Sequence, residues 1–191
     1  MIIGVPKEIK LQEHRIGLTP ESVKALTDRN HEVLIENNGG YEAGFTNDDY
    51  LKAGAKIIKT AEEIFKKAEL IVKVKEPQMN EVQMIREGQI IYTYLHLAAA
   101  KELTLGLMKT KSICIAYETV TDDSGRLPLL APMSAVAGRM SVQAGAHALE
   151  KNQKGRGLLI GGAPGVDPAN VVILGGGVVG ENAAIIATGM R

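Results

Sequence analysis

The chain has 191 residues, which is enough for one large domain or for one and a half ordinary domains. Basic and acidic residues balance at 22 each, so no charge imbalance points to nucleic acid or to an acidic membrane surface. Tryptophan is absent and only two residues are phenylalanine, which further disfavours a surface for stacking bases. We therefore expect neither a nucleic-acid partner nor a membrane partner.

The first part of the chain alternates short apolar segments with helix signals. The strands are expected at residues 1–5, 32–36, 70–74, 89–95 and 112–117. The helices are expected at residues 20–29, 46–53, from 60, 80–88 and 98–109. Regular alternation of this kind, with strands that are continuously apolar, predicts an α/β domain whose parallel sheet is covered on both faces.

Three loops of this domain carry side chains that could do chemistry. Ligands of a parallel α/β sheet bind beyond the carboxyl ends of its strands, and the loops at three of those ends carry Arg15, Lys75 and His96. The guanidinium of Arg15 can hold a carboxylate through two parallel hydrogen bonds, and Lys75 can bind a carbonyl or carboxylate oxygen. His96 carries an imidazole, the side chain whose ordinary charge change near neutral pH suits proton transfer. Each residue also has a structural interpretation, namely a solvated arginine, a strand-end lysine that reaches water, and a core histidine.

A long helix is predicted to follow a turn at residues 121–125. Pro132 suits its first turn, and its many small residues invite close approach of another helix. We place one domain boundary near residue 130, so that residues 1–130 form the first domain. The glycine-rich segment 155–165 is interpreted as a connector, with a second phosphate loop as the alternative.

The glycine motif that follows is the strongest local signal. Residues 171–174 form an apolar run, and Gly175, Gly177 and Gly180 then satisfy G-x-G-x-x-G before a helix-like segment. The first glycine allows a tight turn, the second lets the backbone approach a pyrophosphate, and the third lets the helix pack closely on the strand. This context favours a dinucleotide-binding turn over an ordinary glycine-rich connection.

The sequence ends eleven residues after Gly180. A Rossmann half needs at least two further strands, and an acidic residue about 20 positions on to hold the ribose. We therefore expect residues 131–191 to hold a linker helix and the first strand, turn and helix of an incomplete NAD-binding Rossmann domain.

The remaining signals concern the compartment and other chemistries. Cys114 is the single cysteine and lies in an apolar run, so we expect a buried structural thiol and no disulfide framework. No signal pattern and no apolar run of membrane-spanning length is found, and the protein is predicted to be cytoplasmic. No residues show the spacing of a metal site, and there is no serine nucleophile elbow.

Several of these segments together resemble the alanine dehydrogenase family. The matching segments are residues 3–8, 13–20, 74–77, 94–98 and 131–138, followed by the glycine turn. Several motifs in the same order are far more specific than the glycine turn alone. The resemblance covers the whole length of the chain.

The resemblance implies NAD-dependent, reversible oxidative deamination of L-alanine to pyruvate and ammonia. In that scheme Arg15 pairs with the substrate carboxylate, Lys75 binds the pyruvate oxygen, and His96 serves in proton transfer. Lys75 and His96 would be the catalytic residues. The cofactor would lie against Met133, Ser134, Gly175, Gly177, Val178, Val179 and Gly180.

The resemblance also sets expectations about partners. It implies a homo-oligomer, usually a hexamer, or association with a complementing C-terminal half, and the chain alone is expected to be inactive. One alternative is the nucleotide-binding part of a proton-translocating transhydrogenase; the segments around Lys75 and His96 favour alanine dehydrogenase. The other alternative is a non-catalytic assembly or small-acid-binding fragment.

Overall fold

The structure, a computed structural model, describes residues 1–190 and divides into two units. The first unit is Met1–Thr119, and the second begins at Val120. The division lies ten residues before the domain boundary placed near residue 130 from the sequence. The long helix expected to open the second domain, α6 (Ala131–Leu149), belongs wholly to the second unit.

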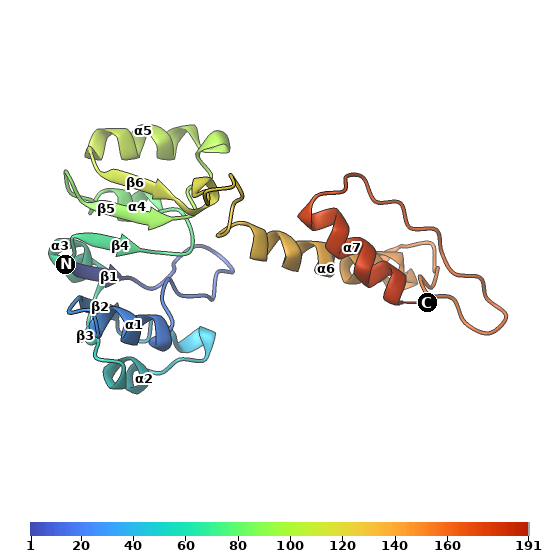
Figure 1. The fold of residues 1–191 in the computed structure, drawn as a ribbon, viewed down its shortest axis with the longest axis horizontal. Helices are drawn as coiled ribbons and strands as arrows, with labels where there is room; N and C mark the ends of the chain where they lie inside the picture. The colour runs from blue at the N-terminus through green and yellow to red at the C-terminus, as the bar shows by residue number, and fades with distance from the viewer. Residues whose placement is uncertain (191) are drawn as a thin grey trace. The chain divides into compact units, whose positions relative to one another are not determined.

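A six-stranded parallel sheet forms the centre of the first unit (Figure 1). Its strands are β1 (Ile2–Val5), β2 (Glu32–Glu36), β3 (Lys56–Ile58), β4 (Leu70–Val72), β5 (Ile90–Thr93) and β6 (Ile113–Ala116). The order across the sheet is β3-β2-β1-β4-β5-β6, and every neighbouring pair is parallel. The chain winds outward from β1 in one direction and then returns to β4 and winds in the other. This doubly wound arrangement confirms the predicted α/β class.

Strand β3 was not expected, so the prediction of five strands was wrong. It lies at the edge of the sheet and pairs only with β2, with Leu34 opposite Lys56 and Glu36 opposite Ile58. None of its three residues is buried, and one of them is a lysine. A continuous apolar run is typical of central strands that are covered on both faces, so an edge strand gives a weaker signal.

The helices of the first unit connect the strands. They are α1 (Pro20–Thr27), α2 (Asn47–Lys52), α3 (Ala61–Lys67), α4 (Met79–Val82) and α5 (Lys101–Thr110). Helix α1 begins where predicted, and the Oγ1 atom of its N-cap Thr19 accepts a hydrogen bond from the backbone N–H of Ser22 at 3.3 Å. The helix expected over residues 80–88 was wrong in extent, because α4 ends at Val82. The backbone N–H groups of Met84 and Ile85 donate to carbonyl oxygens three residues earlier, which is a 3-10 pattern and ends the α-helix.

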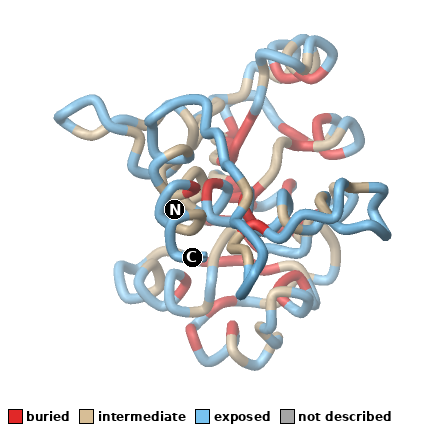
Figure 2. Tube along the Cα trace, turned by 90° about the vertical axis from the view of Figure 1, so that its right-hand side faces the viewer, coloured by how far each residue is buried: buried red, intermediate tan, exposed pale blue. Residues whose placement is uncertain are grey.

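Two hydrophobic clusters cover the two faces of the sheet. One cluster joins α3, α4 and α5 to the sheet and contains the fully buried Ile64 and Phe65. The other joins α1 and α2 to the opposite face and contains the fully buried Val23 and Tyr50. Figure 2 shows the buried residues as short red stretches among intermediate and exposed segments. Each such side chain contributes about 1.5–3 kcal/mol through removal of apolar surface from water.

A buried charge cluster lies among the loops at the carboxyl ends of the strands. The Nζ atom of Lys73 is 3.2 Å from a carboxylate oxygen of Glu8 and 2.8 Å from one of Glu81, and the Lys73 side chain is only 1% exposed. Burial raises the pKa of Glu8, and the charge of Lys73 opposes that rise. The cluster therefore ties the loop after β1, the loop after β4 and helix α4 together.

We expect Lys73→Met to destabilise the first unit by about 3–5 kcal/mol, because it leaves two buried carboxylates without their cation. All five tyrosines lie before residue 120 and the chain has no tryptophan, so tyrosine fluorescence during urea unfolding reports on this unit alone. The matched control is Lys59→Met at an exposed position, which should change the free energy of unfolding by less than about 0.5 kcal/mol. Equal values for the two variants would contradict a structural role for the cluster.

In the second unit, helix α6 packs against α7 (Val178–Gly189). The helices come closest at Gly138, where an added Cβ would lie 2.2 Å from the carbonyl oxygen of Val179. Next to this contact, Nε of Arg139 donates to Oδ1 of Asn182 at 3.0 Å. Among residues 1–190 no helix is both long and apolar enough to cross a membrane.

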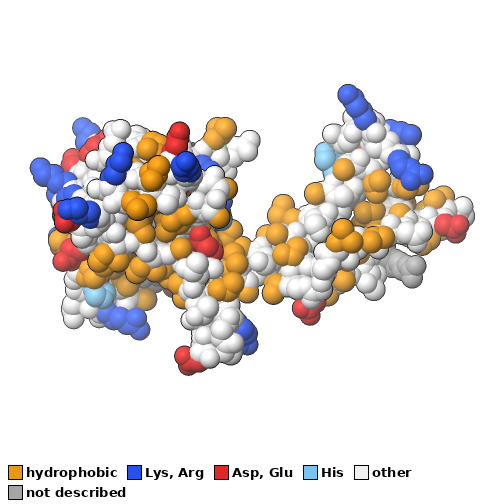
Figure 3. Space-filling view, turned by 90° about the horizontal axis from the view of Figure 1, so that it is seen from above, with side chains coloured by type: hydrophobic (Ala, Val, Ile, Leu, Met, Phe, Trp, Pro, Cys, Tyr) orange, Lys and Arg blue, Asp and Glu red, His pale blue; other side chains and the backbone are white. Residues whose placement is uncertain are grey.

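Residues 171–174 do not form the strand that their sequence predicts, and this part of the prediction was wrong. Val172 is 82% exposed and Leu174 is 94% exposed. A strand is defined by hydrogen bonds to a neighbour, and the described part of the second unit contains only an isolated bridge between Ala163 and Val166. The apolar run therefore stays extended without a partner, and the surface of this unit carries many hydrophobic side chains (Figure 3).

A matched pair of glycines on α6 tests the contact between the helices. We expect Gly138→Ala to destabilise the second unit, because the new methyl group collides with the backbone of α7. In contrast, an added Cβ at Gly145 meets no atom within 4 Å, so Gly145→Ala should stabilise the helix by about 0.5–1 kcal/mol. Thermal unfolding followed by circular dichroism measures both; a stabilising Gly138→Ala would contradict the close contact.

Candidate functional site

The loops after β1, β4 and β5 are joined at the carboxyl edge of the sheet, where these strands are neighbours. One carboxylate oxygen of Glu8 accepts hydrogen bonds from the backbone N–H groups of Val74 at 2.6 Å and Lys75 at 3.4 Å. On the other side, Oγ1 of Thr93 donates to the carbonyl oxygen of Lys75 at 2.8 Å. The backbone of Lys75 is therefore held by both neighbouring segments, while the residue itself is only half-buried.

Arg15 lies in the loop after β1 and already holds a carboxylate. Its Nε and Nη2 atoms donate to the two oxygens of Glu13 at 2.8 Å and 2.6 Å. The Glu13 side chain is 8% exposed, whereas that of Arg15 is 48% exposed. The hydrogen bonds from Arg15 lower the pKa of Glu13 to about 2 against the effect of burial, and the charge of Lys75 contributes to the lowering.

His96 is exposed at the end of β5 and has a left-handed backbone, with φ 50° and ψ 37°. Its ring stacks on that of Tyr94, with centroids 6.0 Å apart and planes 17° from parallel. The pKa of Glu76, which directly follows Lys75, lies below its usual range: burial raises it, but a hydrogen bond from Lys10 and, more weakly, the charge of His96 lower it. His96 is thus electrostatically coupled to the loop that carries Lys75.

The structure therefore brings the three predicted residues of the first unit to one edge of the sheet. Each comes from a different loop, and each remains accessible to solvent. An arginine, a lysine and an imidazole gathered in this way suit a small acid that carries a second oxygen or nitrogen function beside its carboxylate. The roles of Arg15, Lys75 and His96 stay predictions.

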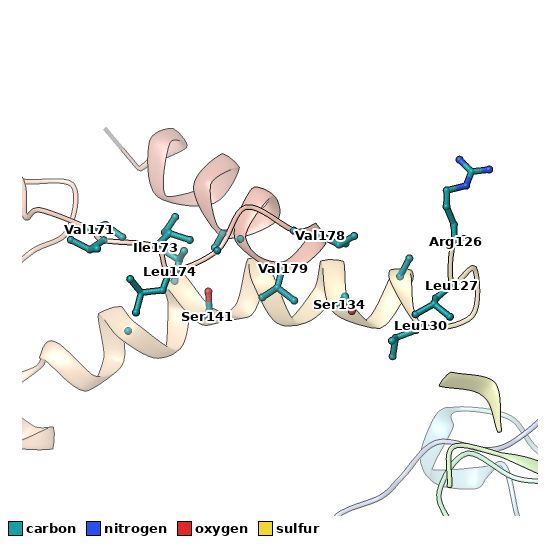
Figure 4. A pocket seen from close by; sticks show the side chains of 18 of the residues that line it. Arg126, Leu127, Leu130, Ser134, Ser141, Val171, Ile173, Leu174, Val178 and Val179 are labelled. Atoms are coloured by element: carbon teal, nitrogen blue, oxygen red, sulfur yellow. The ribbon is translucent and has the colours of Figure 1, made fainter. Parts of the chain in front are cut away.

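The second unit contains a groove of about 810 Å³ between α6, α7 and the segment before α7 (Figure 4). Ser134 and Ser141 line it from α6, and the extended segment 171–174 runs along its other side (Figure 4). Met133 is half-buried on the same turn of α6 as Ser134. The three glycines of the motif also line the groove.

The glycine turn has the geometry that a pyrophosphate site requires. Gly175 has φ +102°, which side chains rarely tolerate, and an added Cβ at Gly180 would lie 2.0 Å from the carbonyl oxygen of Gly175. At Gly177, by contrast, an added Cβ meets no described atom within 4 Å, so this backbone is open to a ligand. Helix α7 starts directly after Gly177 with no side-chain cap, which leaves the N–H groups of Val178 and Val179 at a helix N-terminus that favours anions. These residues fit a dinucleotide.

Comparison with known proteins identifies the family. The model of the alanine dehydrogenase/PNT N-terminal domain matches residues 4–137, and that of the alanine dehydrogenase/PNT C-terminal domain matches residues 141–191. The chain belongs to the alanine dehydrogenase/PNT family. This confirms the resemblance drawn from the sequence motifs.

Curated relatives in this family agree. The chain is 54% identical to alanine dehydrogenases from Halomonas elongata and Methanococcus maripaludis, and 49% identical to one from Mycobacterium tuberculosis, each over 190 residues. In each case the match covers all of this chain and 51% of the relative. The chain therefore spans about half the length of these relatives.

Solved structures of the family show the same fold. A structure of L-alanine dehydrogenase superposes with a TM-score of 0.92 at 54% identity, covering all of this chain and 52% of the other. A transhydrogenase from Sinorhizobium meliloti superposes with a TM-score of 0.81 at 23% identity, covering all of this chain and 56% of the other. The second likeness concerns the fold alone.

The glutamates that hold the candidate residues were not predicted from the sequence. Glu13 had an available signal, because a carboxylate two positions before Arg15 can reach the same guanidinium within one loop. Glu8 had no local signal, since its partners lie more than 60 residues away. Such partners become visible only when the strands are placed in order.

The pair formed by Arg15 and Glu13 predicts a shift that can be measured. We expect Arg15→Met to raise the pKa of Glu13 from about 2 toward the ordinary 4.5, as followed by NMR titration of the Glu13 carboxyl group. The folded pKa lies below the unfolded one, so the pair stabilises the protein above pH 4.5 and this contribution is lost as the pH falls toward 2. Lys24→Met, at an exposed position on α1, is the control and should leave the pKa of Glu13 unchanged. An unchanged pKa in Arg15→Met would contradict the pairing.

Proposed function

We propose that this chain supplies the substrate-binding domain and the first part of the NAD-binding domain of an L-alanine dehydrogenase. The reaction is the reversible, NAD-dependent oxidative deamination of L-alanine to pyruvate and ammonia. The observation that carries the proposal is the convergence of Arg15, Lys75 and His96 at one sheet edge, in a chain of the alanine dehydrogenase/PNT family. The glycine turn of the second unit supports it independently.

Arg15 would bind the carboxylate that alanine and pyruvate share. Its guanidinium carries five N–H donors in a fixed plane, and the bond to Glu13 shows that a carboxylate can be held there in the paired geometry. The substrate would share the guanidinium with Glu13 or displace it. Arginine suits this role better than lysine because two parallel hydrogen bonds fix the orientation of the acid.

Lys75 and His96 would act at the carbon that changes. The ammonium group of Lys75 would donate to the carbonyl oxygen of pyruvate and stabilise the negative charge which that oxygen gains when ammonia adds. His96 would hold and release the proton that this oxygen takes up or loses. The fixed backbone of Lys75 suits such a role, because transition-state stabilisation requires donors that are already oriented.

The second unit would bind NAD, which accepts the hydride of alanine when bound. Gly175, Gly177 and Gly180 would shape the turn, and the N–H groups of Val178 and Val179 would face the pyrophosphate. Met133 and Ser134 on the first turn of α6 would lie against the cofactor. The open backbone at Gly177 is the feature of the turn that best fits this role.

The proposal extends to partners and location. The exposed apolar residues of segment 171–174 support association with further protein, as a homo-oligomer or with a chain that supplies further strands. The single cysteine rules out a disulfide framework within the chain, which fits a reducing compartment and supports a cytoplasmic location. Relatives that are 49–54% identical carry the name alanine dehydrogenase, which favours this function over that of the transhydrogenase.

The test uses the extended chain, defined as this sequence joined to the part of the Halomonas elongata relative that lies beyond the matched half. We expect NADH formation from L-alanine and NAD, and we expect Lys75→Ala and His96→Ala to abolish it while calorimetry still detects NAD binding. The control is Lys101→Ala, an exposed lysine on α5, which should retain full turnover.

Normal turnover in Lys75→Ala or His96→Ala would remove that residue from the catalytic assignment. An unaltered extended chain that folds and binds NAD but forms no NADH would overturn the proposed reaction. Binding of pyruvate by the 191-residue chain without any binding of NAD would instead favour a small-acid-binding domain.

A further inference from the structure

Glu118 contacts the backbone on which His96 is carried. It lies in η3 (Tyr117–Thr119), one turn of 3-10 helix that follows β6, and β6 is the neighbour of β5 in the sheet. One of its carboxylate oxygens accepts hydrogen bonds from the backbone N–H groups of His96 at 2.8 Å and Leu95 at 3.1 Å, and its other oxygen is 3.2 Å from the Leu95 nitrogen. Two consecutive N–H groups therefore converge on one negative group.

The backbone of His96, which donates one of these hydrogen bonds, is in an unfavourable conformation. The left-handed region, in which His96 lies, is uncommon for residues other than glycine, although asparagine, aspartate and histidine adopt it more often than the rest. A residue stays there only when its surroundings fix it. Hydrogen bonds to an ionised acceptor are about twice as strong as neutral ones, so the carboxylate of Glu118 is well suited to hold this conformation.

Glu118 and His96 also border the same cavity. A space of about 480 Å³ is lined by residues 95–99 on one side and by Ala116, Glu118 and Thr119 on the other. The contact between the two segments thus forms a wall of a cavity at the carboxyl edge of the sheet. A change at Glu118 would alter this wall as well as the direction in which the His96 backbone leaves the strand.

We propose that Glu118 is the positioning residue of His96. Its carboxylate fixes the left-handed turn at the end of β5 and thereby sets where the imidazole stands relative to a bound substrate. The catalytic part of this inference rests on the proposed alanine dehydrogenase function. The part that concerns the hydrogen bonds between Glu118 and the backbone of Leu95 and His96 does not. Neither the family resemblance nor the sequence motifs assigned a role to Glu118.

The first experiment measures how strongly Glu118 protects the backbone N–H groups of Leu95 and His96, and it needs no enzymatic activity. Amide hydrogen exchange of Leu95 and His96 is followed by NMR in the 191-residue chain and in Glu118→Gln and Glu118→Ala. We expect exchange at these two amides to accelerate by about tenfold or more in Glu118→Ala, and by less in Glu118→Gln, which keeps one acceptor oxygen. Ile91 within β5 should keep its rate in all variants, as should every amide near Glu118 in the exposed control Glu102→Gln. Unchanged exchange at Leu95 and His96 in Glu118→Ala would overturn the proposal.

The second experiment measures the consequence in the extended chain. We expect Glu118→Ala to lower kcat by about 100-fold, because a misplaced proton-transfer group loses its alignment with the substrate. The KM for pyruvate should change by less than about threefold, since Arg15 and Lys75 lie on other loops, and Glu118→Gln should recover most of the loss in kcat. Loss of folded protein alone would lower the amount of active enzyme in proportion to the tyrosine fluorescence signal, so kcat per folded molecule separates the two effects.

The two experiments distinguish failure of the proposed function from failure of the positioning role of Glu118. A folded extended chain without turnover, before any substitution, would overturn the proposed function, and the exchange rates would still decide whether Glu118 holds His96. A wild-type kcat per folded molecule in Glu118→Ala would overturn the positioning role even if the exchange rates change.

Discussion

The candidate site depends on the parallel register of β1, β4 and β5. Neighbouring strands lie about 4.8 Å apart, and parallel strands end at the same edge, so loops that are far apart in the sequence meet there. The edge leaves backbone N–H groups beyond the last ladder bond, and these groups need acceptors. Glutamates supply them: Glu8 accepts from the loop after β4, and Glu118 accepts from the end of β5. The same register that gathers the candidate residues therefore also gathers the carboxylates that orient their backbones.

The two lysines of the loop after β4 show how burial separates structural from accessible charge. Lys73 is buried and forms ion pairs with two glutamates, whereas Lys75 is half-buried. They stand two positions apart, and both follow an apolar strand, so the sequence offers no means to tell which one is structural. The decisive factor is tertiary, because Glu8 and Glu81 approach Lys73 from a different loop and from α4. The energy of burying Lys73 is offset only while both carboxylates remain in place.

The parts of the fold that were predicted from the sequence are those with local causes. Strand β2 was expected at the residues that form it, because its apolar run is central in the sheet, and α1 was expected from its cap and its proline. Strand β3 was missed because an edge strand needs little apolar surface. The three candidate residues of the first unit were found from their places after strands, whereas Glu118 was not, since its hydrogen bonds exist only once β6 lies beside β5. Sequence patterns indicate where in the fold a residue lies. Tertiary contacts decide which groups hold it in place.

In the second unit, the glycine turn forms, whereas the strand predicted just before it does not. Its turn is shaped by contacts inside the motif, where Gly180 packs on the carbonyl of Gly175, and by the contact of Gly138 with α7. The turn and the helix therefore form although residues 171–174 have no partner strand among the residues described. The strand, in contrast, needs hydrogen bonds from a neighbour, and its apolar side chains need a covering layer. The geometry of the turn thus depends on contacts within the motif and with α6, whereas the strand depends on a neighbouring strand.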